Sequence, residues 1–190
     1  MKSLRNYAFM MIGALVLAIA AVIIFSPSTH KYPAPTEHRQ AISEVMSDYC
    51  AVQKALASDD PVGLVAAAEK LEQSSGRLEL MSIQNLPASL HSIWEYEVSR
   101  LHEDVIPLRG WGEDLKPPRV LFKRVSTRLG ILVATMGHAH NVPIYVVRCP
   151  MAFDNEGADW LQDSEQIRNP YFGKEMLECG QITKTFPPGR

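Results

Sequence analysis

The chain has 190 residues, of which 46% are hydrophobic, and its formal net charge at pH 7 is −2. This length allows one membrane segment and one globular domain of ordinary size, but not a second core. Because the net charge is close to zero, the sequence offers no basic patch for a nucleic-acid backbone, and nucleic acid is excluded as a partner.

An apolar run without any charged residue extends from Ala8 to Phe25 and follows two basic residues. About 20 apolar residues span a bilayer, so the run predicts a transmembrane anchor over residues 1–25 with its basic end in the cytoplasm. A cleaved signal peptide is the alternative, but the run ends without a small-x-small cleavage site, which favours the anchor. The predicted location is therefore the cell inner membrane, in single-pass form, with the C-terminal domain in the periplasm.

Residues 26–39 contain three prolines and predict a semi-rigid linker before a domain over residues 40–186. Within that domain, apolar residues recur at three- and four-residue spacing in four segments. The first segment ends near Ser58, the second runs from Pro61 to Leu71, the third opens at Leu86, and the fourth extends from Pro117 to Gly137. Four amphipathic helices with short connections predict an antiparallel four-helix bundle.

The hydrophobic period changes from helical to alternating after the fourth segment. Residues 143–148 and 181–186 are rich in β-branched and aromatic side chains and predict two strands, with a short helix over residues 171–177 between them. Antiparallel pairing of the two strands would bring Cys149 and Cys179 close together, although the sequence does not fix the register. The predicted fold class is mainly α: an N-terminal membrane anchor, an antiparallel four-helix bundle and a small C-terminal β-hairpin cap over residues 143–186.

Soft side chains gather in this predicted cap. One cysteine and one methionine lie two residues apart at its start, and a second such pair lies three residues apart near its end, so each pair can point in one direction. Thiolates and thioethers select Cu(I) over harder cations, and two histidines just upstream could add imidazole. The candidate metal ligands are Cys149, Met151, Met176, Cys179, His138 and His140.

A disulfide between Cys149 and Cys179 is the competing interpretation of the same residues. It would close a loop of about thirty residues and contribute ~3 to 4 kcal/mol in an oxidising compartment, with the methionines as packing groups. Neither a C-x-x-C motif nor a compact set of metal ligands is present to decide between the two. Both interpretations therefore remain open at the level of the sequence.

The sequence contains no pattern for catalysis. A G-x-S-x-G elbow, a P-loop, a dinucleotide fingerprint and an H-E-x-x-H motif are all missing. The acidic stretch from Asp154 to Asp159 is not an EF-hand loop, because aspartate stands at the sixth position where that loop needs glycine. The sequence therefore predicts a protein that is not an enzyme.

The string CPMAFDNEGADWLQ, followed by EQIRNPYFGKEMLECG, resembles the closing signature of a bacterial domain family whose function is not established. The resemblance covers roughly Ile42 to Thr185 and is strongest over the last forty residues. Members of that family are typically exported or membrane-attached, and several sit beside or are fused to adaptor subunits of CusB-type copper and silver efflux pumps. The resemblance implies an accessory protein in copper handling with an efflux adaptor as a possible partner. It implies no enzyme activity.

Overall fold

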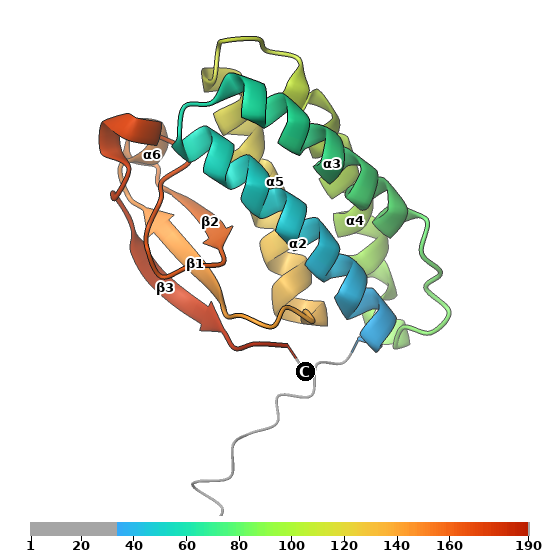
Figure 1. Ribbon diagram of the computed structural model, residues 1–190. Helices are drawn as coiled ribbons and strands as arrows, with labels where there is room; N and C mark the ends of the chain where they lie inside the picture. Colours follow the sequence, from blue (N-terminus) through green and yellow to red (C-terminus); the bar gives the residue numbers. More distant parts are fainter. Residues whose placement is uncertain (1–33, 190) are drawn as a thin grey trace, which may run out of the picture. The chain divides into compact units, whose positions relative to one another are not determined.

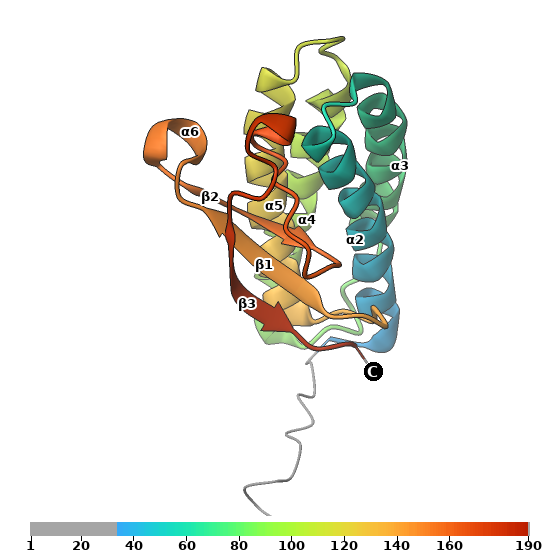
Figure 2. The same ribbon diagram turned by 60° about the vertical axis from the view of Figure 1, so that its left-hand side comes forward.

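The computed structural model of the protein describes residues 34–189. Its four long helices run up and down as a bundle (Figure 1). A three-stranded antiparallel sheet packs against α5 and α2, on one side of the bundle (Figures 1 and 2). The long helices are α2 (Thr36–Ala57), α3 (Pro61–Glu79), α4 (His91–Val105) and α5 (Lys116–Met136), and the 3-10 helices η1 (Ala88–Leu90) and η2 (Ile106–Arg109) flank α4.

The ends of the helices follow from local chemistry. The Asp60 side chain accepts a hydrogen bond of 2.9 Å from the Gly63 N–H and caps α3, and Pro61 occupies the first turn, where a missing N–H costs nothing. At the other end of the bundle, Gly137 ends α5 with a φ of 85°, a conformation that favours glycine. Apolar stripes on the helices form one continuous core with the inner residues of the sheet.

Helix α3 extends about two turns beyond the end that the sequence predicts. The polar stretch after Leu71 continues as helix because Ser74 and Ser75 are buried and hydrogen-bond to carbonyls of the preceding turn. Leu78 then adds one more buried residue on the core face. Short hydroxyl side chains can remain inside a helix when they bond back to it. At the N-terminal side, α2 begins at Thr36, so residues 36–39 are helical and do not belong to a linker.

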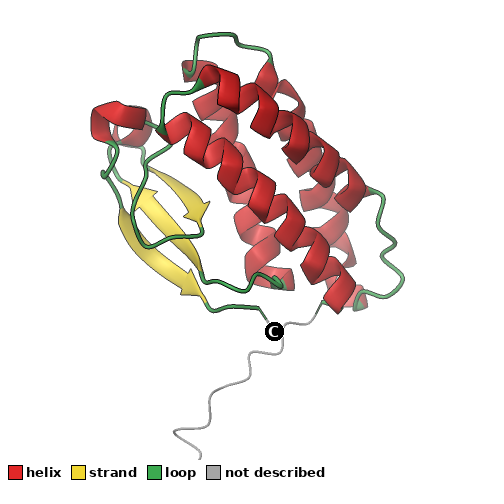
Figure 3. Cartoon of the chain, in the orientation of Figure 1, coloured by secondary structure: helices red, strands yellow, loops and turns green. Residues whose placement is uncertain are grey.

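The predicted hairpin cap is corrected to a sheet of three strands in the order β2-β1-β3 (Figure 3). The central strand β1 (Ile144–Cys149) pairs with β3 (Gln181–Phe186) as the sequence predicts, but also with β2 (Ala158–Gln162), which the sequence analysis missed. The short turn α6 (Ala152–Asn155) joins β1 to β2. It reverses the chain through three consecutive residues with positive φ, at positions 153, 154 and 155. The predicted short helix is the single 3-10 turn η3 (Gly173–Met176).

The prediction of a membrane anchor, and with it the single-pass inner-membrane location, is also corrected. Within residues 34–189, no helix is long and apolar enough to cross a bilayer. Residues 1–25, on which the anchor was predicted, lie outside the described part of the chain.

Candidate functional site

Cys149 and Cys179 meet at one end of the sheet. Cys149 is the last residue of β1, and Cys179 lies two residues before β3, whose Gln181 is paired with Arg148. This register leaves the two sulfur atoms 3.1 Å apart as free thiols. Cys149 is fully buried, whereas Cys179 is only half-buried. The two thiols therefore form one site in which Cys149 lies toward the core and Cys179 lies toward solvent.

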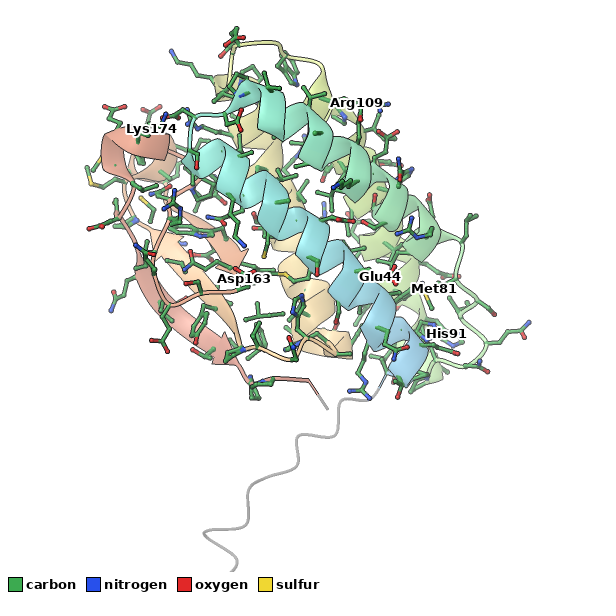
Figure 4. All side chains as sticks on the ribbon, in the orientation of Figure 1. Glu44, Met81, His91, Arg109, Asp163 and Lys174 are labelled. Carbon is green, nitrogen blue, oxygen red and sulfur yellow. The ribbon has the colours of Figure 1, made fainter. Side chains whose placement is uncertain are left out.

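The loop that carries Cys179 is attached to the bundle by Arg119 on α5. Its guanidinium donates to the Pro170 carbonyl at 3.0 Å and pairs with Asp59, which lies in the turn between α2 and α3. The second carboxylate oxygen of Asp59 accepts from the Lys174 N–H at 2.9 Å. Figure 4 shows Lys174 on this loop, at the end of the bundle where α2 leads into α3. Burial disfavours the charged carboxylate, but the bonds from Lys174 and Arg119 outweigh it and lower the pKa of Asp59.

The methionines of the predicted site differ from those of the core. Met46 and Met136 are fully buried, as methionines that only fill space usually are. Met151 is 46% exposed, directly after the turn at Pro150, and Met176 is half-buried in η3. The Met176 carbonyl accepts from the Cys179 N–H at 3.0 Å, so this methionine and the cysteine belong to one turn. Two thioethers are thus accessible in the segments next to the thiols.

The structure places His138 and His140 away from the thiols. Both precede β1, and the His140 carbonyl accepts from the Gly189 N–H, beyond the end of β3. The cysteines lie at the opposite end of β1, and a strand of six residues spans roughly 17 Å. The histidines therefore do not belong to the same ligand set.

Two of the cysteines, Cys179 and Cys50, have raised pKa values that favour the neutral thiol at pH 7. The hydrogen bond with Cys149, together with burial, raises the pKa of Cys179 to about 11. The third cysteine, Cys50 on α2, is buried and has a pKa raised by burial to about 12. A neutral thiol is a poor nucleophile and a poor metal ligand. A metal ion that binds Cys179 would therefore have to displace its proton.

Within residues 34–189, His, Cys, Asp and Glu do not gather in groups of three that could hold a metal ion. For an ion held by Cys149 and Cys179, the nearest further donors along the chain are the thioethers of Met151 and Met176. A soft ion with a low coordination number fits this donor set better than zinc, which takes four ligands.

His138 is a buried histidine whose protonation should destabilise the folded domain. It is buried, its Nδ1 accepts from the His140 N–H at 3.2 Å, and it bonds to the Pro187 backbone. Burial, assisted by His140 and Arg39, lowers its pKa from 6.5 to about 4. Between these values the unfolded chain binds a proton that the folded chain does not, so the free energy of unfolding falls as the pH falls.

We expect a loss of roughly 3 kcal/mol between pH 7.5 and pH 4, which corresponds to the size of this pKa change. Urea titrations across this range measure it. In a His138→Asn variant, which keeps an acceptor for the His140 N–H but does not titrate, most of this pH dependence should vanish. An unchanged slope in the variant would assign the acid sensitivity to other groups.

Comparison with known proteins gives no relative: neither a family model, nor a curated protein, nor a solved structure matches the chain. The resemblance to the family associated with copper efflux therefore stays a prediction from the sequence.

Proposed function

We propose that the protein is a non-enzymatic accessory protein in copper handling that binds one Cu(I) ion between the sulfurs of Cys149 and Cys179. The observation that carries this proposal is the distance of 3.1 Å between the two sulfurs, which lie next to two strands of one sheet and need no large movement to share an ion. Soft sulfur ligands select Cu(I) over harder cations.

Met151 and Met176 are the proposed additional ligands. Both lie within three residues of a site cysteine, and both are accessible, in contrast to the core methionines. A thioether adds softness without charge, so we assign the methionines a smaller share of the affinity than the cysteines. His138 and His140 are left out of the proposed site because they lie at the other end of β1.

The proposed binding depends on pH in a definite direction. Each thiol that binds the ion must lose its proton, and the pKa of Cys179 is about 11. Between pH 6 and pH 8, the apparent affinity for Cu(I) should therefore rise by about tenfold per pH unit for each proton released. The slope of affinity against pH, measured by chelator competition, gives the number of thiols that ionise. A flat profile would contradict coordination by the thiols.

The site suits storage or transfer of a bound ion better than catalysis of a reaction at that ion. One sulfur faces the core and the other is half-buried, so an incoming ion would meet Cys179 first. The proposed partner is an adaptor subunit of a copper efflux pump, and this part of the proposal rests on the sequence resemblance alone.

A second candidate function uses the same contact differently. Because the thiols already touch, oxidation would join them and close the cap covalently, and the protein would then be a structural interaction module. A disulfide carries no charge and so suits the buried position of Cys149. It would contribute about 3 to 4 kcal/mol by closing the loop between them.

Metal analysis combined with thiol labelling separates the two functions. The full chain is purified without oxygen, loaded with Cu(I), freed of excess metal and treated with an alkylating reagent. We expect one copper per chain and protection from the reagent of Cys179, the thiol that is open to solvent. Copper-free protein in which Cys179 is alkylated would contradict the proposal. A disulfide in protein taken directly from cells, with no copper uptake after reduction, would favour the second candidate.

A further inference from the structure

Asn169 is the centre of the loop between β2 and β3. Its side-chain nitrogen donates to the Cys179 carbonyl at 2.7 Å. Its side-chain oxygen accepts from the N–H groups of Tyr171 and Phe172, at 2.8 and 3.3 Å. Its backbone N–H donates to the Leu177 carbonyl at 2.7 Å. One residue thus ties both ends of the loop segment that carries Cys179.

The hydrogen bond from Asn169 to Cys179 is protected from water. Asn169 is fully buried, so its amide cannot exchange this bond for one to solvent without cost. Cys179 itself lies outside the strand, and its own N–H bonds only within the turn, to Met176. Besides the pairing of Gln181 with Arg148, a side chain ten residues earlier therefore helps to fix the position of Cys179 relative to the sheet.

Gly180, the next residue, makes a second set of close contacts for the same segment. A Cβ atom at this position would lie 2.7 Å from the Trp160 ring and 3.0 Å from Val147, the strand residue that precedes Arg148. The chain around Cys179 is thus in contact with Trp160 through Gly180 and hydrogen-bonded to the amide of Asn169 through Cys179. Loss of the amide removes the second of these two contacts.

We propose that Asn169 is a positioning residue that sets the effective concentration of the Cys179 thiol at Cys149. Two thiols that the fold holds close together form a disulfide, or bind one ion, more readily than two thiols that move independently. The gain in equilibrium constant depends on how closely the fold holds them. Asn169 therefore controls both the ease of disulfide formation and the affinity of the pair for a soft ion. The second of these effects rests on the proposed function, and the first does not.

The test uses the full chain and two variants of Asn169. Asn169→Asp keeps the size and the oxygen that accepts from Tyr171 and Phe172, but replaces the donor to Cys179. Asn169→Ser is shorter and neutral, and serves if a buried carboxylate prevents folding. Ser75→Ala is the matched control, because Ser75 is a fully buried residue of α3 that bonds to His102, far along the chain from the cap.

The first readout is the dithiol–disulfide equilibrium in glutathione buffers. Cys149 and Cys179 lose two protons and two electrons and form one S–S bond, while one glutathione disulfide is cleaved to two thiols. We expect the equilibrium constant for disulfide formation to fall about tenfold in the Asn169 variants, which corresponds to the loss of one hydrogen bond. The reduction potential of the disulfide should then rise by about 30 mV. Ser75→Ala should leave the equilibrium constant and the reduction potential unchanged, although it lowers the free energy of unfolding.

The second readout is Cu(I) affinity by chelator competition, which should fall in parallel. An unchanged potential in the folded Asn169 variants would overturn the proposal. An equal change in Ser75→Ala would also overturn it, because the effect would then be general loosening. If the potential changes only in the Asn169 variants while even the wild type fails to bind Cu(I), the positioning role stands and the proposed function falls.

Discussion

Replacement of Trp160 by alanine should lower the free energy of unfolding by about 3 to 5 kcal/mol, as large-to-small changes at buried aromatic positions do. Trp160 is 1% exposed and lies in β2 opposite Val147 of β1. Its ring packs edge to face on Tyr171, with 5.8 Å between the ring centres, and it touches Gly180. The cavity would thus open beneath the loop that carries Cys179.

The Trp160 variant also leaves a polar atom without its main donor. The Trp160 Nε1–H donates at 2.9 Å to the side-chain oxygen of Gln162, which is itself buried. The oxygen keeps a long contact of 3.5 Å with the Arg168 N–H, and this poorer satisfaction of a buried acceptor adds to the cost of the cavity. Trp160→Phe loses the donor and part of the ring volume but keeps one six-membered ring in the buried site, so it should cost clearly less than Trp160→Ala.

Urea titration of the variants measures these costs, and the chain offers a matched control. Trp111 is 43% exposed in the connection between α4 and α5, so Trp111→Ala should cost less than about 1 kcal/mol. If Trp160→Ala also cost under 1 kcal/mol, Trp160 would not be an anchor of the cap.

Exchange of either site cysteine should weaken Cu(I) binding more than any other single change. We expect Cys149→Ser and Cys179→Ser each to lower the affinity by more than about 100-fold, beyond the range for residues that only support a ligand. Met151→Leu and Met176→Leu should have smaller effects, because a thioether brings no charge. Serine keeps the shape of cysteine without its soft donor atom.

Three variants control for indirect effects in this series. Cys50→Ser removes the remaining cysteine, which is buried on α2, and should leave the affinity unchanged. His138→Asn and His140→Asn should also leave it unchanged, since both histidines lie at the other end of β1. A large loss in a histidine variant, with both cysteines intact, would contradict the ligand set proposed above.

The helices could be predicted from the sequence because their signals are local. The apolar stripes of α2, α4 and α5 and the proline at the start of α3 act within a few residues. The extension of α3 could not be predicted, because Ser74 and Ser75 look like loop residues until they are buried against another helix. Tertiary packing decides such cases.

Strand β2 and the arrangement of the site depend on contacts that no local pattern shows. The residues before β2 reverse the chain with positive φ at Phe153, Asp154 and Asn155, although only one glycine is nearby. The sequence could suggest that Cys149 and Cys179 come together, because the β-branched and aromatic residues of β1 and β3 predict both strands. It could not show that Asn169 holds Cys179 in place, or that the histidines lie at the far end of β1.

The most direct test of the central claim is an anaerobic Cu(I) competition titration with a colorimetric chelator under reducing conditions. It compares the wild type with the Cys149→Ser, Cys179→Ser double variant, and Zn(II) serves as the control for nonspecific thiol binding. The account predicts one Cu(I) per wild-type chain, a large loss in the double variant and weak Zn(II) binding by both. Equal Cu(I) affinities for the wild type and the double variant would contradict it.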